Sequence, residues 1–266
     1  MPGMDRLGII GFGTMGEAFA TALRRAHPRI AISAFDVKPG RLAAAAPALG
    51  VTVARDPASV VRESDLTLLC VKPQDIGALM AVLAPQAKGK RFVSILAGTR
   101  IARLQEGLGA TLVARFMPNI AAVAGKALVG VSFAPEADPG FRADCLALAG
   151  ALGSALEIPE RLMAAMTGLS GSGLAYVFAF ADAMALGGVA AGFDYPTALK
   201  VAVETIESGA AMLRSAGAHP RELASRVASP AGTTIQGLRA LERGGFAAAV
   251  MEAVEAGARR AQELEG

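Results

Sequence analysis

A change of pattern near residue 159 constrains the fold of this chain more than any other feature. Up to about residue 157, short apolar runs alternate with alanine-rich helical stretches, which is typical of βαβ units around a parallel sheet. The expected strands are residues 6–10, 30–35, 51–54, 66–71, 92–96, 112–116, 128–133 and 155–158, and helices are expected at 16–25, 40–49, 74–84 and 143–152. Beyond Pro159 the strand pattern disappears.

Residues 160–266 carry apolar side chains at helical spacing instead. In the last helix these are Val250, Val254, Ala258, Ala261 and Leu264. A length of 266 residues accommodates two domains of ordinary size. We therefore predict an α/β domain over residues 1–159 and an all-α domain over residues 160–266.

Charge, cysteine and histidine usage exclude several classes of protein. The net charge is only +3, without a run of five basic residues, so no nucleic-acid partner is expected. His27 and His219 lack a second histidine or cysteine at ligand spacing, so no metal site is predicted. Cys70 and Cys145 lie far apart in apolar stretches and indicate free thiols in a reducing compartment. Without the pattern of a signal peptide at residue 1, we expect a cytoplasmic protein.

One segment, residues 174–192, is almost wholly apolar and approaches the length that spans a bilayer. Asp182 lies at its centre, where a charge costs roughly 2.5 to 3.5 kcal/mol on insertion scales. Neither end carries a cluster of Lys or Arg. We therefore predict no membrane association, and interpret the segment as a helix buried between subunits.

A glycine loop follows the first expected strand, in the sequence Gly11-Phe12-Gly13-Thr14-Met15-Gly16. In a GxGxxG loop the first glycine permits a tight turn, the second lets the backbone approach a pyrophosphate, and the third lets helix and strand pack closely. The helix N-terminus then faces the anion. We therefore predict a Rossmann-type dinucleotide-binding domain with Gly11, Gly13, Thr14, Met15 and Gly16 at the cofactor.

The adenosine end of the cofactor has conflicting signals. Asp36, at the end of the second strand, could accept a hydrogen bond from the ribose of NAD. Lys38 and Arg41, just downstream, provide the positive charge that the extra phosphate of NADP requires. These residues alone leave the choice between NAD and NADP open.

Further cofactor contacts are expected after the later strands, because open α/β sheets bind ligands at the carboxyl edge of their strands. The residues that follow three of these strands, and that we expect to position the nicotinamide riboside, are Val71, Lys72 and Pro73, then Ala97 and Gly98, then Asn119.

Two clusters of glycine and hydroxyl residues, 169–173 and 229–234, each precede a helical run. Backbone amides and hydroxyls there could hold a substrate carboxylate. The predicted substrate-binding residues are Ser172, Ser229, Gly232, Thr233 and Thr234. The alternative is that Ser170 and Ser229 serve only as helix caps.

Together these motifs resemble the pyrroline-5-carboxylate reductases, which catalyse the last step of proline synthesis. The resemblance spans nearly the whole chain and is carried by the glycine loop and by residues 71–74, 115–119, 169–176, 241–242 and 244–246. Its most specific part is the block Val227-Ala-Ser-Pro-Ala-Gly-Thr-Thr-Ile-Gln-Gly-Leu238.

The resemblance implies a hydride transfer from NADPH, or from NADH, to the imine carbon of 1-pyrroline-5-carboxylate, which gives L-proline. It assigns Thr234 as the catalytic residue that hydrogen-bonds the ring nitrogen, with neighbouring amides on the carboxylate. It also implies a homodimer or higher homo-oligomer formed through the helical domain. No nucleophile is required, because the cofactor supplies the hydride.

Five residues depart from the family pattern. Ala231 stands where the family has a glycine, Leu174 where it has a proline, Ile120-Ala121 where Thr-Pro is common, and Ala218 where a polar residue is frequent. None removes a group assigned to the chemistry. At Ala231, however, a positive φ angle would strain the predicted carboxylate loop.

Two other functions fit the same architecture. A β-hydroxyacid dehydrogenase would use a lysine with an asparagine one turn later, but Lys200 is followed by Glu204 at that spacing. A non-enzymatic sensor of dinucleotides would need the opening glycines but not the block from Ser229 to Thr234.

Overall fold

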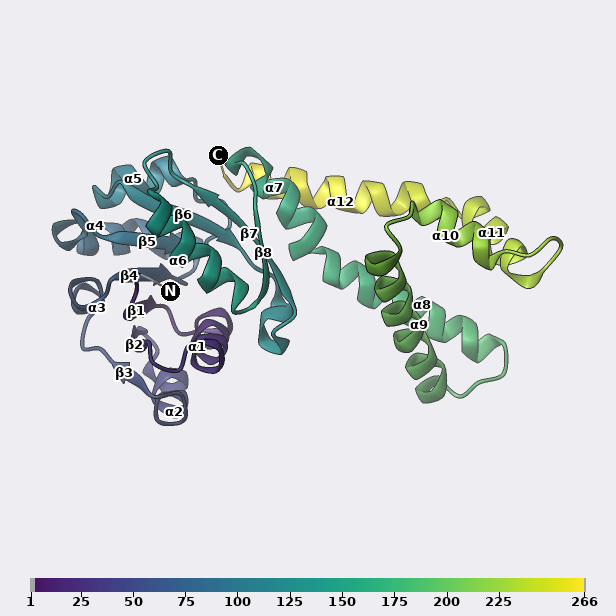
Figure 1. Ribbon diagram of the computed structural model, residues 1–266, viewed down its shortest axis with the longest axis horizontal. Helices are drawn as coiled ribbons and strands as arrows, with labels where there is room; N and C mark the ends of the chain where they lie inside the picture. Colours follow the sequence, from purple (N-terminus) through teal and green to yellow (C-terminus); the bar gives the residue numbers. More distant parts are fainter. Residues whose placement is uncertain (1–2, 266) are drawn as a thin grey trace. The chain divides into compact units, whose positions relative to one another are not determined.

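The computed structural model describes residues 3–265 (Figure 1). Their contacts form two compact units. The sheet unit runs to Ser172 and includes the chain from Ala256 onward, and the helical unit comprises Gly173–Glu255. Residues 160–172 thus pack with the sheet. The division predicted at residue 159 rests on sequence pattern and stays a prediction about domain organisation.

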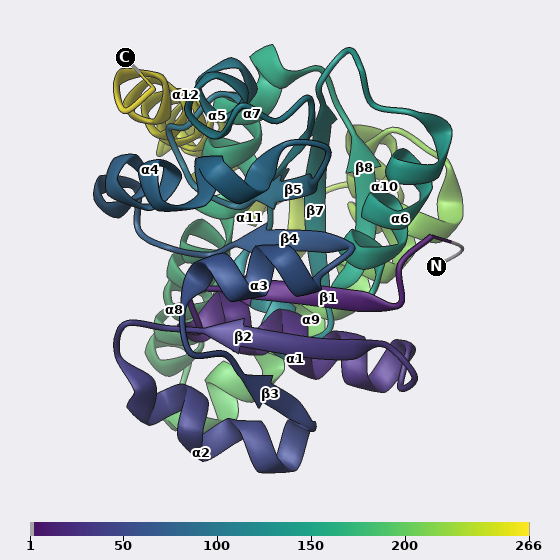
Figure 2. The same cartoon turned by 90° about the vertical axis from the view of Figure 1, so that its left-hand side faces the viewer.

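The sheet unit is built on one sheet of eight strands. Their order is β3-β2-β1-β4-β5-β6-β7-β8, and Figure 2 shows the first five of them side by side. The bounds are β1 Arg6–Ile10, β2 Ala31–Phe35, β3 Val51–Val53, β4 Leu66–Leu69, β5 Arg91–Ser94, β6 Leu112–Met117, β7 Ala127–Phe133 and β8 Gly153–Glu157. All neighbours pair in parallel except β6 and β7. The predicted α/β fold is confirmed.

Alternate residues of the central strands enter opposite layers of the core, as the strand period of two requires. On β1, Leu7 and Ile9 join the cluster that contains Phe19, whereas Ile10 joins the one that contains Leu83. Helices α1 (Thr14–Ala26), α2 (Pro39–Leu49) and α6 (Pro139–Gly150) contribute to the first layer. Helices α3 (Pro57–Glu63), α4 (Ile76–Ala87) and α5 (Ile101–Leu108) contribute to the second.

Two of these helices, α3 and α5, were not predicted. Helix α3 begins at Pro57, after Asp56 accepts a hydrogen bond from the Ser59 amide at 2.7 Å, and that bond lowers the pKa of Asp56. Helix α6 begins four residues before its predicted start for a related reason, because Asp138 accepts from the Phe141 amide at 2.8 Å. Such capping aspartates followed by proline are helix-start signals.

The chain leaves the sheet through short helical segments. They are η3 (Glu160–Leu162), α7 (Met163–Met166) and the π-helical turn η4 (Thr167–Gly171), and two single turns, η1 (Pro73–Asp75) and η2 (Ile120–Ala124), lie earlier in this unit. The glycine and hydroxyl cluster at residues 169–173 does not break the helix, because Thr167–Gly171 forms a wider π turn and the helix continues to Ala190. Turns of this kind often occur at functional sites.

The helical unit contains α8 (Gly173–Ala190), α9 (Tyr195–Ala216), α10 (Pro220–Val227), α11 (Thr233–Arg243) and the first part of α12 (Phe246–Glu263). Small buried residues such as Ala185 and Ala202 let α8 and α9 pack closely. The Tyr176 hydroxyl on α8 donates to the Ala253 carbonyl on α12 at 3.0 Å. The all-α character predicted after Pro159 is therefore observed.

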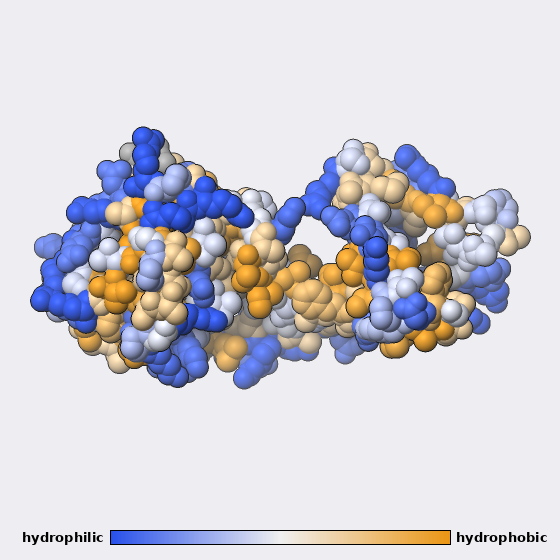
Figure 3. All heavy atoms as spheres, turned by 90° about the horizontal axis from the view of Figure 1, so that it is seen from below, coloured by the Kyte–Doolittle hydropathy of each residue, from blue (hydrophilic) through white to orange (hydrophobic). Residues whose placement is uncertain are grey.

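The helical unit leaves many large apolar side chains at its surface (Figure 3). Phe178 is 63% exposed, and Leu186 and Met212 are exposed as well. The continuous helix Glu160–Ala190 is long and apolar enough to cross a membrane, and only 11% of its most apolar window is buried. Asp182, the one charge on α8, accepts a hydrogen bond from the Tyr195 hydroxyl at 2.7 Å.

Candidate functional site

The glycine loop joins β1 to α1 as a tight turn. Gly11 has a φ of 95°, and a Cβ on Gly16 would collide with the Gly11 carbonyl oxygen. A Cβ on Gly13 would meet no described atom within 4 Å. Gly13 is also the N-cap of α1 and receives no side-chain cap, so the first amides of the helix are available to an anion. The loop therefore fits a pyrophosphate.

This loop lies where the strand order reverses. The Gly11 amide donates to the Phe35 carbonyl at 2.8 Å, and the Cys70 amide donates to the Ile10 carbonyl at 2.7 Å. The chain proceeds from β1 to β2 on one side, and β4 lies on the other. Open α/β sheets bind their ligands at such a point. Burial raises the pKa of the Cys70 thiol, so this nearby sulfur is protonated and is not a nucleophile.

Asp36 holds the glycine loop by both carboxylate oxygens. Its Oδ2 accepts from the Phe12 amide at 2.5 Å, and its Oδ1 accepts from the Lys38 amide at 2.7 Å. The residue that sequence favoured as a ribose acceptor is thus committed to the backbone. The side chain of Arg41, half-exposed, instead extends to the start of α1, where Nη1 donates to Thr14 Oγ1 at 2.9 Å.

The other predicted cofactor residues follow β4, β5 and β6 at the same edge of the sheet. Lys72 and Pro73 are exposed at the start of η1, and Ala97 and Gly98 are partly buried. Asn119 caps η2 through Oδ1, which accepts from the Ala121 amide at 3.2 Å. These residues lie in the sheet unit together with Gly11 to Gly16, as the strand topology predicted.

Asn119 also connects this edge to the first glycine and hydroxyl cluster. Its Nδ2 donates to Ser170 Oγ at 3.0 Å, so Ser170 does not serve only as a helix cap. Ser172, two residues later, donates its amide to the Thr167 carbonyl at 2.8 Å within the π turn. The sheet unit therefore brings a predicted cofactor residue next to a predicted substrate segment.

The second cluster lies in the helical unit, before α11. The Gly232 amide donates to the Ser229 carbonyl at 3.0 Å, and α11 begins at Thr233 with Gly232 as its N-cap. Ser229 is therefore not the cap of this helix. No described side chain caps Gly232, so the first amides of α11 lie free beside the Thr233 and Thr234 side chains. A carboxylate is the kind of ligand that such a helix start attracts.

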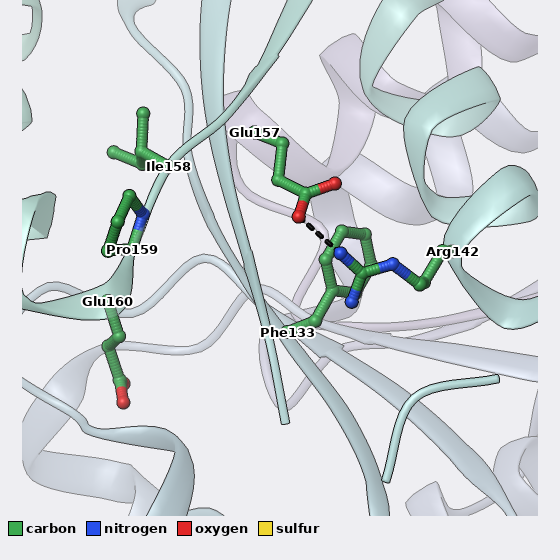
Figure 4. Close-up of a pocket in the computed structure, with 6 residues that line it drawn as sticks. All are labelled: Phe133, Arg142, Glu157, Ile158, Pro159 and Glu160. Atoms are coloured by element: carbon green, nitrogen blue, oxygen red, sulfur yellow. Dashed lines mark hydrogen bonds and ion pairs between the residues drawn. The ribbon is translucent and has the colours of Figure 1, made fainter. Parts of the chain in front are cut away.

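A separate hollow of about 300 Å³ lies at the edge of the sheet and is lined by Phe133, Arg142, Glu157, Ile158, Pro159 and Glu160 (Figure 4). Arg142 pairs with Glu157 there and lies 4.4 Å from the centre of the Phe133 ring. No predicted site residue lines it. Within residues 3–265, no group of three or more metal-ligating side chains is found.

Comparisons with known proteins identify the family of this chain. Residues 160–264 match the family model described as pyrroline-5-carboxylate reductase dimerisation, and residues 6–98 match the model described as NADP oxidoreductase, coenzyme F420-dependent. The pyrroline-5-carboxylate reductase of Methanosarcina acetivorans is 40% identical over 265 residues, which cover 98% of each chain. The chain belongs to the pyrroline-5-carboxylate reductase family.

Other relatives agree with this membership. The pyrroline-5-carboxylate reductase of Glycine max is 39% identical over 97% of this chain and 95% of its own. The solved enzyme of Streptococcus pyogenes is 28% identical, with a TM-score of 0.87 over 98% of both chains. The predicted family, fold class and oxidoreductase class are confirmed.

Sequence reasoning missed one charged residue at this edge of the sheet. Arg115 lies on β6 and is 1% exposed. The sequence named residues 115–119 as part of a family motif but gave Arg115 no role. The available signal was a lone arginine inside an apolar strand, because such a charge needs a buried partner.

An added methyl group should affect stability differently at two glycines of the loop. Gly16→Ala should lower both the melting temperature and NADPH affinity, because its Cβ collides with the Gly11 carbonyl. Gly13→Ala should fold normally but bind NADPH at least about tenfold more weakly, because its Cβ occupies the open side of the loop. Thermal melting and NADPH titration measure both effects.

The control is Gly77→Ala on α4, whose added Cβ also meets no described atom within 4 Å. It should leave NADPH affinity unchanged. If Gly13→Ala binds NADPH like the Gly77→Ala control, the open side of the loop is not the phosphate site.

Ala231 is the one non-glycine residue with positive φ, 55°, among residues 3–265. Because left-handed backbone costs an L-residue about 1 to 2 kcal/mol, Ala231→Gly should raise the free energy of unfolding by ~0.5 to 1 kcal/mol after the extra chain entropy of glycine is deducted. Urea denaturation followed by circular dichroism measures this. Ala228→Gly is the matched control. Ala228 has a φ of −89°, so glycine there should lower the free energy of unfolding. Equal destabilisation of both variants would contradict the assigned strain.

Proposed function

We propose that this protein reduces the carbon-nitrogen double bond of 1-pyrroline-5-carboxylate to L-proline, with NADPH as the hydride donor. The observation that carries the proposal is the uncapped start of α11, where free amides adjoin Thr233 and Thr234 in a member of this reductase family. The substrate has an anionic carboxylate and a basic ring nitrogen. A helix start with hydroxyl side chains offers a suitable donor to each.

The glycine loop would bind the pyrophosphate of the cofactor. Amides at the start of α1 would donate to its phosphates, while Asp36 keeps the loop in place through the Phe12 amide. Val71, Lys72, Pro73, Ala97, Gly98 and Asn119 would position the nicotinamide riboside. The bound cofactor supplies the hydride, and these residues of the chain orient it.

Thr234 would hydrogen-bond the ring nitrogen of the imine. When a hydride adds to the imine carbon, the nitrogen becomes more basic, so a positioned donor stabilises the reaction more than the ground state. Ser229, Gly232 and Thr233 would hold the carboxylate through amides and hydroxyls. No nucleophile is needed for this chemistry.

The choice of NADPH over NADH rests on Asp36 and Arg41, which indicate different cofactors in the sequence. The carboxylate of Asp36 is occupied by backbone amides, whereas the half-exposed guanidinium of Arg41 lies at the start of α1 beside Thr14. A guanidinium matches the geometry of a phosphate and donates charge-assisted hydrogen bonds. Arg41, with Lys38 nearby, would therefore bind the 2′-phosphate, and Asp36 would position the loop.

We infer that two copies of the chain associate through their helical units. The matched dimerisation model covers residues 160–264, and exposed apolar residues such as Phe178 and Leu186 on α8 would be covered by the partner. This assembly, and not a bilayer, would then account for the apolar helix Glu160–Ala190. We propose a cytoplasmic homodimer or higher homo-oligomer acting on a small imine.

The central variant is Thr234→Ala. In an assay of NADPH absorbance with 1-pyrroline-5-carboxylate, its kcat/KM should fall about 100-fold, in the range seen when one donor to a developing charge is removed. NADPH affinity should not change. Thr234→Ser should retain most activity because it keeps the hydroxyl, and Thr52→Ala, exposed on β3, is the control for threonine loss elsewhere.

The same assay separates the competing functions. Turnover of a hydroxy acid without turnover of the imine would favour a dehydrogenase, and cofactor binding without turnover would favour a sensor. Either result with the wild-type protein would overturn the proposed function. An unchanged rate for Thr234→Ala would overturn the role of that residue alone.

Arg41→Ala tests the cofactor assignment. Its KM for NADPH should rise about tenfold or more, because a charge-assisted contact to the 2′-phosphate is lost, while its KM for NADH stays within about twofold. Arg55→Ala is the control, since Arg55 is 80% exposed and pairs with Asp56. An equal change for both cofactors would contradict this role.

A further inference from the structure

The loop between β5 and α5 is held by Leu264 and Glu265, which directly follow α12. A Cβ on Gly98 would lie 2.5 Å from the Leu264 carbonyl oxygen, so the two backbones approach more closely than a side chain would permit. Glu265 follows directly and is largely buried, with 10% of its side chain exposed. The segment after α12 thus packs against a loop that the proposed function assigns to the nicotinamide.

Glu265 forms a buried ion pair with Arg115. The Arg115 Nη2 donates to Glu265 Oε1 at 2.6 Å, and this guanidinium is 1% exposed. Its Nε has no hydrogen-bond partner, so its charge depends on the carboxylates around it. The other oxygen of Glu265 lies 3.4 Å from Nε of Arg100, which belongs to the loop itself.

A second carboxylate also lies beside Arg115, and it comes from the start of the helical part of the sequence. Glu160 Oε1 accepts from the Ile101 amide at 2.7 Å and lies 3.5 Å from Arg115 Nη1. Two arginines and two glutamates therefore balance in charge around this loop. Because Arg115 sits on β6, paired with Ser94 of β5, the network is fixed to the rigid centre of the sheet.

The loop is consequently held at successive residues. Ala97 packs against the cluster of Met117, Met163 and Met166, Gly98 lies under Leu264, and Ile101 is bonded to Glu160. Glu160 connects Arg115 to Ile101, at the start of α5, and Glu265 connects Arg115 to Arg100, within the loop itself. Position errors of about 1 Å at a reacting group can cost a factor of 100, so this support bears on hydride transfer.

We propose that Glu265 is a positioning residue for the nicotinamide half of the cofactor. It acts through Arg115 and Arg100 to fix the loop around Ala97 and Gly98, and it does not touch the reacting atoms. The proposal rests on the proposed function, which assigns Ala97 and Gly98 to the nicotinamide riboside. It gives Glu265 a part in a site formed by residues more than 140 positions earlier in the chain.

The test compares two ligands in wild-type protein and in Glu265→Gln. The ligands are NADPH and 2′-phosphoadenosine 5′-diphosphoribose, which lacks only the nicotinamide ring. In the variant, calorimetry should show a Kd for NADPH raised about tenfold, and a Kd for the nicotinamide-free ligand within about twofold of wild type. Glu265→Asp, which keeps the charge, should recover most of the lost NADPH affinity.

Glu263→Gln is the matched control, because Glu263 lies on the last turn of α12 and pairs only with the exposed Arg260 at 2.8 Å. It should bind both ligands like wild type. An equal loss of both ligands in Glu265→Gln, or a lowered melting temperature with no change in their ratio, would show a merely structural role and overturn the proposal.

Failure of the proposed function gives a different result. In that case wild-type protein would bind NADPH no more tightly than the nicotinamide-free ligand, or would not reduce the imine. If wild-type protein does both and Glu265→Gln leaves the ratio of the two Kd values unchanged, only the positioning role is wrong.

Discussion

The contact between Gly16 and the Gly11 carbonyl is the constraint on which the rest of the site depends. It brings the start of α1 against the end of β1, so that uncapped amides lie where the order of strands reverses. Asp36 then fixes the loop from β2 through the Phe12 amide. A helix start with free amides at this point has a strong preference for a phosphate. The remaining loops at the sheet edge would contact the rest of the molecule whose phosphate is bound there.

Much of this arrangement could be predicted from the sequence. The eight strands were all expected, and β1 was predicted at its observed bounds, because apolar runs between turn residues are unambiguous in a parallel sheet. The short helices α3 and α5 were missed because each has only about two turns, although α5 buries Ile101, Leu104 and Leu108 at helical spacing. In α3, Asp56 and Pro57 were nevertheless an available signal.

The functional details that sequence could not supply depend on hydrogen-bond partners. Asp36 stands at the position of a ribose acceptor, and only its bonds to Phe12 and Lys38 reveal that its oxygens are engaged. Glu265 lies 150 positions from Arg115 along the chain, so no local pattern connects them. At Ala231 the strain could be anticipated from the sequence. This alanine stands where the family has a glycine, and its φ is positive.

The reaction proposed for this protein is the transfer of a hydride from NADPH to the carbon of a cyclic imine. The most direct measurement uses NADPH that carries deuterium at the transferable position of nicotinamide C4, with 1-pyrroline-5-carboxylate as substrate. Mass spectrometry and NMR should find proline with one deuterium on C5, the carbon that was double-bonded to nitrogen in the imine, in an amount equal to the NADPH oxidised. Oxidation of NADPH without deuterated proline, or no oxidation at all, would contradict the account.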